Sequence, residues 1–71
     1  MDKLEQIVAN FLSSKFEEWK PYLNTDEQAV FILYYFKGYK TFQIAMEINY
    51  SERQIFRILK SARKKINKLL P

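Results

Sequence analysis

The C-terminal segment 51–69, SERQIFRILKSARKKINKL, is the feature that most narrows what this chain can form. Its apolar residues recur at spacings of three and four, which is the period of one face of an α-helix. At about 100° per residue the apolar and the basic residues separate onto opposite faces. The apolar face holds Ile55, Ile58, Leu59, Ala62, Ile66 and Leu69, and the basic face holds Arg53, Arg57, Lys60 and Lys64. The segment therefore predicts a long amphipathic helix.

Two segments earlier in the chain also carry helical signals. Residues 2–20 have an apolar stripe at the same spacing, and Pro21 is expected to end that helix because the residue before a proline is pushed out of the helical region. The next helix is expected to begin with Thr25 as its N-cap, with Gln28 completing a capping box, and to end at Gly38 in a left-handed conformation. A buried β-strand over VFILYYF is the competing interpretation, and the signals at both ends favour the helix.

Residues 41–48 predict a short helix capped by Thr41, and together with residues 51–69 they have the pattern of a helix-turn-helix. Such a unit needs a small residue where its helices approach, here Ala45, and a turn residue that tolerates positive φ, here Asn49. Ser51 and Gln54 form a capping box. The residues expected on the shared inner side are Ile44, Ile48, Tyr50, Ile55 and Ile58. A plain helical hairpin without a ligand is the structural alternative.

The length of the chain predicts one small domain over residues 1–71, and the helical segments predict that it is all-α. We expect a bundle of four helices without a wing, in which residues 1–20 form an accessory N-terminal helix and residues 41–69 the helix-turn-helix. The chain has no cysteine and no histidine, which excludes the usual zinc sites and the Ser-His and Cys-His catalytic pairs. We expect no enzyme activity, metal, cofactor or small-molecule ligand. No signal peptide or membrane-length apolar run is visible, so we expect a cytoplasmic protein.

Charge is divided unevenly along the chain. Residues 1–36 contain three lysines and six acidic residues, a net charge of −3, whereas residues 37–71 contain nine basic and two acidic residues, a net charge of +7. This asymmetry favours a polyanion-binding half joined to a half of another kind. Double-stranded DNA is the expected partner, because the start of the second helix of such a motif enters the major groove.

The residue types at that helix start suit base recognition. Arg53 and Arg57 can each bind guanine with two hydrogen bonds, and Gln54 can bind adenine in the same way. Glu52 could accept from cytosine, although a favourable charge at the helix N-terminus is the preferred explanation. Phe56 fits neither face, and it either contacts a thymine methyl group or packs on a neighbouring helix or partner. The candidate phosphate contacts are Lys40, Thr41, Ser51, Lys60, Lys64 and Lys65; capping alone would also account for Thr41 and Ser51.

The segment from Leu23 to Leu70 resembles region four of bacterial sigma factors, the domain that binds the −35 promoter element, and the sigma-like regulators of phages and prophages of low-GC bacteria. The resemblance lies in NTDEQAVF, YYFKGY, the dipeptide IA, YSERQIFRI and ARKKI. It implies that the residues after the Ser51 cap read promoter bases, namely Glu52, Arg53, Gln54, Phe56 and Arg57. The family commonly has Arg-Glu-Arg after the cap and a basic residue in place of Phe56, so the resemblance implies a target other than the −35 consensus.

The first helix has two interpretations. Its aromatic residues Phe11, Phe16 and Trp19 either complete the core or form an interface with RNA polymerase or with a second copy of the chain. A homodimer would engage two half-sites, as isolated helix-turn-helix proteins often do. Two functions follow: a sequence-specific DNA-binding transcription regulator, or a protein-interaction module of the same fold that binds RNA polymerase or a sigma factor. No membrane partner is expected.

Overall fold

The computed structural model describes residues 4, 7 and 14–69. These residues contain four α-helices: α2 (Ser14–Trp19), α3 (Thr25–Phe31), α4 (Thr41–Ile48) and α5 (Glu52–Leu69). A 3-10 turn, η1 (Lys20–Tyr22), follows α2, and a π-helical segment, η2 (Ile32–Phe36), follows α3. The described part of the chain contains no β-strand, so the all-α prediction is confirmed and the strand alternative for VFILYYF is wrong. Most of the helix predicted over residues 2–20 lies outside the described residues.

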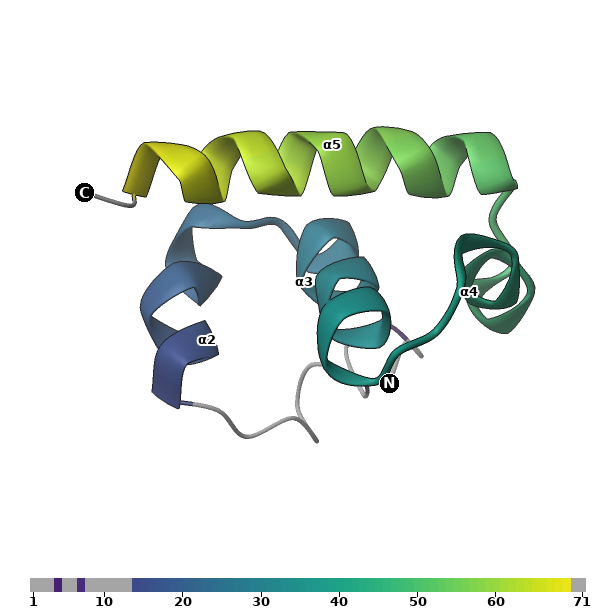
Figure 1. Cartoon of the computed structure of the whole chain (residues 1–71), viewed down its shortest axis with the longest axis horizontal. Helices are drawn as coiled ribbons and strands as arrows, with labels where there is room; N and C mark the ends of the chain where they lie inside the picture. Colours follow the sequence, from purple (N-terminus) through teal and green to yellow (C-terminus); the bar gives the residue numbers. More distant parts are fainter. Residues whose placement is uncertain (1–3, 5–6, 8–13, 70–71) are drawn as a thin grey trace.

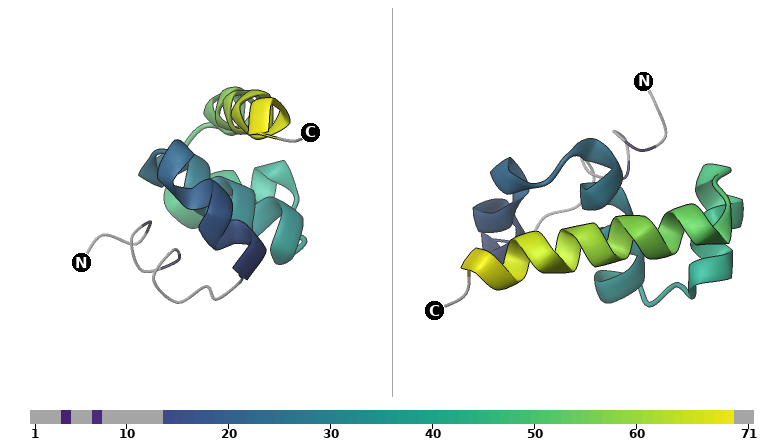
Figure 2. Two further views of the ribbon diagram at one scale, coloured as in Figure 1. Left: turned by 90° about the vertical axis from the view of Figure 1, so that its left-hand side faces the viewer. Right: turned by 90° about the horizontal axis from the view of Figure 1, so that it is seen from above.

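The long helix α5 lies across the other helices and contacts two of them closely (Figures 1 and 2). Its middle and C-terminal part packs on α3, and its N-terminal part packs on α4. In Figure 1 α5 is seen from the side while α4 is seen almost end-on, so the two helices cross steeply. This arrangement leaves the outer face of α5 uncovered along its whole length.

A single apolar core holds the helices together. Its largest fully buried side chains are those of Phe16, Val30, Ile32, Ile44, Ile55 and Leu59. They come from every helix, so each helix contributes its apolar face to one shared interior. The predicted apolar face of α5 is confirmed at four residues that are buried, Ile55, Leu59, Ala62 and Ile66. Ile58 is half-buried. The prediction is wrong for Leu69, which is 36% exposed at the end of the helix.

The aromatic residues of α2 belong to this core. Phe16 is only 1% exposed and stacks on Phe31 with 6.0 Å between the ring centroids. Trp19 is half-buried and meets Phe31 edge-on at 5.9 Å. The partner-interface prediction is therefore wrong for Phe16, because its ring is already covered within the molecule, and Trp19 also packs on the core. Phe11 lies outside the described residues.

The N-terminus of α3 begins one residue earlier than the sequence predicted. Asn24, not Thr25, is the N-cap: its Oδ1 accepts the Glu27 N–H at 2.8 Å, and Glu27 Oε1 accepts the Asn24 N–H at 2.9 Å. Gln28 is free of the cap and instead donates from Nε2 to the carbonyls of Lys20 and Leu23. These bonds tie the start of α3 to the 3-10 turn, in which Pro21 occupies the first turn, where its missing N–H costs nothing.

After α3 the helix continues in the wider π-helical geometry of η2 before it ends. Lys37 N–H donates to the Ile32 carbonyl at 3.0 Å, five residues back, which is the π-helical pattern. Gly38 then adopts φ +73°, and the Tyr39 N–H donates a hydrogen bond to the Leu33 carbonyl at 2.9 Å, where the helix ends. The prediction that Gly38 ends the helix in a left-handed conformation is confirmed, whereas the π-helical segment has no signal in the local sequence.

Candidate nucleic-acid interface

The turn between α4 and α5 has the geometry expected of a helix-turn-helix. Asn49 has φ 60° and ψ 44°, and apart from glycine it is the one described residue with positive φ. Tyr50 N–H donates to the Ala45 carbonyl at 2.9 Å, so the turn closes directly over this small, buried residue. Behind the turn, Ile44 and Ile55 are fully buried. The positive φ predicted for Asn49 is confirmed, and Ala45 is buried beneath the turn.

Side-chain hydrogen bonds fix the start of α5. Ser51 Oγ accepts the Gln54 N–H at 3.1 Å and Gln54 Oε1 accepts the Ser51 N–H at 2.8 Å, which confirms the predicted capping box. Tyr50 adds a long-range anchor, because its hydroxyl donates to Asp26 Oδ1 at 2.8 Å. The direction of α5 is therefore set by bonds to both the turn and α3.

Thr41 has a different role from the predicted cap. The N-cap of α4 is Lys40, whose ammonium group cannot accept a hydrogen bond from the helix backbone. Only half of a capping box therefore forms, in which Gln43 Oε1 accepts the Lys40 N–H at 2.8 Å. Thr41 Oγ1 instead donates to Glu52 Oε2 at 2.8 Å. This bond links the first turn of α4 to the first turn of α5.

Four of the five base-reading candidates separate into two groups. Arg53 and Arg57 are exposed, and no described residue pairs with either guanidinium group. Gln54 and Glu52 are also exposed, but each uses one carboxyl or amide oxygen inside the protein. A bidentate bond from Gln54 to adenine would need that same Oε1 atom, so the two arginines are the side chains best placed to read bases.

The predicted phosphate contacts separate in the same way. Lys40, Lys60 and Lys64 are exposed and have no described partner. The prediction for Lys65 is wrong, because its Nζ lies 2.7 Å from Glu27 Oε1 and forms an ion pair with that carboxylate. Ser51 remains exposed while it caps α5, so its hydroxyl is shared between capping and any further contact.

The Glu27 carboxylate is the main polar contact inside the molecule. It is only 2% exposed, and besides Lys65 it accepts from Ser61 Oγ at 2.6 Å and from the Asn24 N–H at 2.9 Å. Burial raises the pKa of Glu27, but the hydrogen bonds from Lys65, Ser61 and Asn24 and the charge of Lys65 outweigh it and lower the pKa below 4.5. The carboxylate is thus held ionised, and it joins α3 to the C-terminal half of α5.

Arg63 also turns toward the protein, which the sequence did not reveal. Its guanidinium lies over the rings of Tyr34 and Tyr35, 5.7 Å and 5.6 Å from their centroids, and its Nε donates to the Tyr35 hydroxyl. Both tyrosines lie in the π-helical segment η2. Arg63 therefore fastens η2 to α5 while remaining on the exposed surface.

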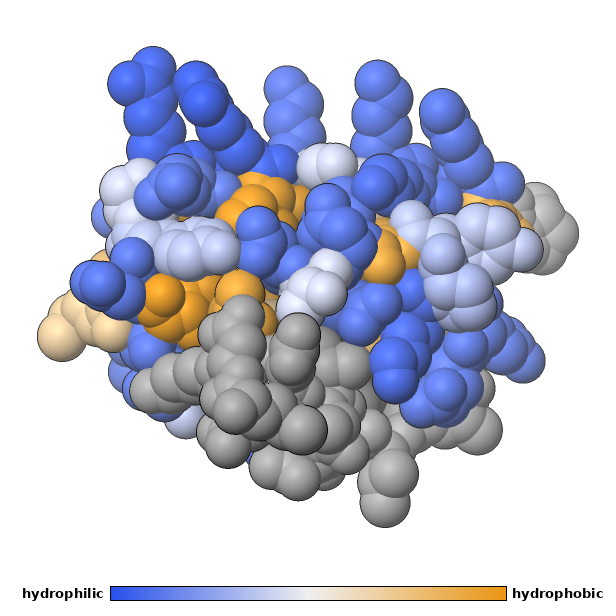
Figure 3. All heavy atoms as spheres, turned by 180° about the vertical axis from the view of Figure 1, so that it is seen from behind, coloured by the Kyte–Doolittle hydropathy of each residue, from blue (hydrophilic) through white to orange (hydrophobic). Residues whose placement is uncertain are grey.

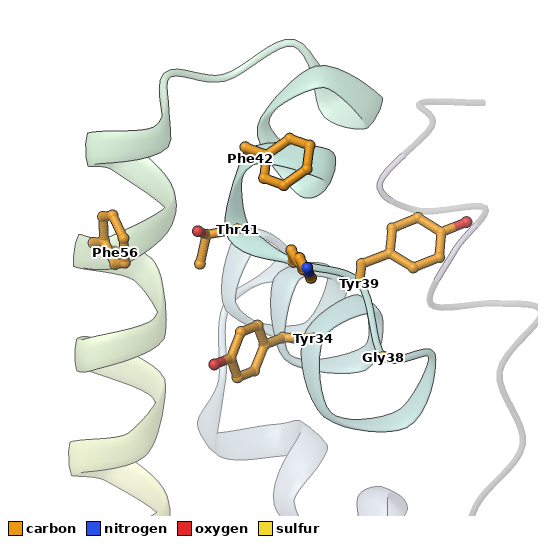
Figure 4. A pocket seen from close by; sticks show the side chains of 7 residues that line it. Tyr34, Gly38, Tyr39, Thr41, Phe42 and Phe56 are labelled. Atoms are coloured by element: carbon orange, nitrogen blue, oxygen red, sulfur yellow. The ribbon is translucent and has the colours of Figure 1, made fainter.

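Phe56 lies at the edge of the basic face. Its ring is 57% exposed, and it lines a surface pocket of about 580 Å³ together with Tyr34, Thr41 and Phe42. Figure 4 shows the pocket between α5, the first turn of α4 and the end of η2. The structure thus gives Phe56 a position beside α4 without covering it. Phe42, which sequence reasoning missed, is 51% exposed and lies across the pocket from Phe56.

Hydrophilic and hydrophobic side chains lie on different parts of the molecular surface. In the view from behind, hydrophilic side chains project in a row along the edge formed by α5, and hydrophobic surface gathers below them toward the α4 end (Figure 3). Within the described part of the chain, no cluster of carboxylate side chains could hold a metal ion. No helix among the described residues has the length and apolar character needed to cross a membrane.

No protein-family model, curated protein sequence or solved structure matches this chain. Function is therefore inferred from the geometry of α4 and α5 and from the charges that they carry.

Proposed function

We propose that the protein is a DNA-binding transcription regulator that inserts the N-terminal part of α5 into the major groove. The observation that carries this proposal is the exposed, unpaired state of Arg53 and Arg57 on the first two turns of the second helix of a helix-turn-helix. In proteins that read DNA in this way, those turns contact base edges while the first helix crosses the backbone. A regulator of this kind, similar to region four of sigma factors, would act in the cytoplasm.

Two further features support the proposal. Lys60 and Lys64 continue the basic face beyond the two arginines, where they can neutralise phosphates without choosing a sequence. The bonds from Ser51, Tyr50 and Thr41 hold the start of α5 rigidly, so its side chains are presented in one orientation. Rigid support of this kind favours sequence selection, because less freedom is lost on binding.

The direct test is a selection of bound duplexes from random DNA, followed by titrations over a range of salt concentrations. We expect one preferred sequence and an affinity that falls steeply with salt. Arg53→Ala and Arg57→Ala should each cost about 1–3 kcal/mol on the preferred sequence and relax the choice of base. Lys64→Ala should weaken binding evenly on all sequences and reduce the salt slope by about one. Absence of duplex binding at low salt would overturn the proposal.

One observation favours a second function, a protein-interaction module that binds RNA polymerase or a sigma factor. Met46 on α4 is 79% exposed, and Phe42 beside it is 51% exposed. Exposed apolar residues that adjoin one another are typical of protein-binding surfaces. Under this alternative, Met46→Ala and Phe42→Ala would abolish binding to the polymerase, and the two arginine variants would leave it unchanged.

A further inference from the structure

The pocket beside Phe56 has walls of an unusual composition for the surface of so small a protein. Four aromatic residues line it: Tyr34 from η2, Tyr39 from the connection between η2 and α4, Phe42 from α4 and Phe56 from α5. In Figure 4 the Tyr34 ring points toward α5, while Phe56 and Phe42 lie on opposite sides of Thr41. Its volume, about 580 Å³, is within the usual range of small-ligand sites, about 300–1,000 Å³.

Cationic groups surround these aromatic walls. Lys40 lines the pocket itself and is exposed, with no described residue as its partner. On α5, Phe56 is three residues from Arg53 and four from Lys60, so it shares a helix face with both. The pocket therefore opens beside the basic face. No acidic side chain lines it, although the Glu52 carboxylate lies next to it and accepts a hydrogen bond from the lining residue Thr41.

We propose that this pocket binds an unpaired nucleobase of a nucleic-acid strand, with Lys40 on the adjoining phosphate. Aromatic rings interleaved with lysine and arginine match the two chemical parts of a nucleotide, a flat base and a negatively charged phosphodiester. Bases inside a duplex have both faces covered by their neighbours, so aromatic walls of this kind select a base that has left the stack. The inference goes beyond the reading of paired DNA by α5 and does not require it.

An apolar segment of a partner protein is the less favoured occupant. A groove for an apolar helix is hydrophobic along its length, whereas the lining here has Lys40 and Thr41 between the aromatic rings. The excess of positive charge in residues 37–71, a net of +7, would also attract a polyanion more strongly than an uncharged peptide.

The test uses the full chain and short duplexes that carry a single-nucleotide bulge. In one duplex the bulged residue is the fluorescent base 2-aminopurine, in a second it is an abasic sugar-phosphate, and a third duplex is fully paired. We expect stacking in the pocket to quench the 2-aminopurine, and the base-containing bulge to bind more tightly than the abasic one. Phe56→Ala or Phe42→Ala should weaken binding of the 2-aminopurine bulge between about fivefold and about a hundredfold, the range expected for loss of one stacking partner.

Met46→Ala is the matched control, because Met46 is exposed on α4 but does not line this pocket. It should leave both the quenching and the affinity unchanged. Equal affinity for the base-containing and abasic bulges, or quenching that survives both phenylalanine substitutions, would overturn the proposal and leave the pocket to a protein partner. Binding to the fully paired duplex is measured separately, so loss of duplex recognition would be distinguished from failure of the pocket.

Discussion

The two ends of α5 carry similar basic residues and use them in opposite ways. In the first half of the helix, Arg53, Arg57 and Lys60 project from the surface without a described partner. In the second half, Arg63 lies over two tyrosine rings and Lys65 pairs with a buried carboxylate. The difference comes from what lies opposite each half: the first half packs against the short helix α4, and the second half against α3 and η2, which supply the acidic and aromatic partners.

This division explains how one helix can serve both stability and binding. The Glu27–Lys65 pair joins the acidic first half of the chain to the basic second half through a partly buried contact, in which the carboxylate is the buried partner. Surface ion pairs contribute little to stability, but a carboxylate that is 2% exposed is costly to leave without its partner. In the second half of α5, Lys65 and Arg63 are therefore committed to the fold, and this leaves Lys64 and the basic residues of the first half for a ligand.

The largest expected effect separates two adjacent lysines. Lys65→Met would leave the buried Glu27 carboxylate without its cation. We expect the free energy of unfolding to fall by about 2–3 kcal/mol, at or below the lower limit of the range of about 3–5 kcal/mol that is typical of broken buried pairs, because Lys65 itself is partly exposed. Lys64→Met, one residue away and exposed, should change it by less than about 0.5 kcal/mol. Urea denaturation of both variants provides the measurement.

The same two variants should have the opposite order of effect on DNA binding, measured by titration. Lys64→Met is expected to reduce the salt dependence of binding, whereas Lys65→Met, measured where it remains folded, is expected to leave it unchanged. If Lys65→Met proves as stable as the unaltered chain, the second half of α5 is not committed to the fold and the contrast between the two halves is lost.

A second, smaller effect concerns the state of the Glu27 carboxyl group. Its pKa is lower in the folded chain than in the unfolded chain, so its ionisation stabilises the fold fully above about pH 4.5 and loses that contribution as the pH falls through the lowered pKa. A single carboxyl contributes a slope of at most about 1.4 kcal/mol per pH unit. The difference in unfolding free energy between the unaltered chain and Glu27→Gln should therefore shrink as the pH is lowered from 5 to 3. A constant difference would show that Glu27 is not ionised within its cluster.

The start of α3 shows where sequence reasoning reached its limit. Two overlapping capping boxes were available, Asn24 with Glu27 and Thr25 with Gln28, and local propensity does not choose between them. The structure uses the first because Glu27 is also needed by Ser61 and Lys65, more than thirty residues away. The caps at Ser51 and the turn at Asn49 had no such competitor, and the sequence predicted both correctly.

The sequence likewise predicted only part of the candidate site. The periodicity of residues 51–69 identified the exposed basic face, including Arg53 and Arg57. It could not show that Lys65 and Arg63 turn inward, because their partners Glu27, Tyr34 and Tyr35 belong to α3 and η2. Nor could it reveal the pocket beside Phe56, since its walls come from three separate elements. Local patterns thus predicted the faces of the helices but not their tertiary partners.

The smallest expected effect locates the boundary between the two halves of α5. Arg63 contacts Tyr34 and Tyr35 at the exposed surface, and a cation–π contact of this kind contributes about 0.5–1 kcal/mol. Arg63→Ala should lower the free energy of unfolding by about that amount and leave the salt dependence of DNA binding unchanged, because the guanidinium is held against the protein. Lys60→Ala, one turn earlier, should do the reverse. If Arg63→Ala instead reduces DNA affinity as much as Lys60→Ala does, the binding face includes Arg63 as well as Lys64, and only Lys65 and Ser61 remain committed to the fold.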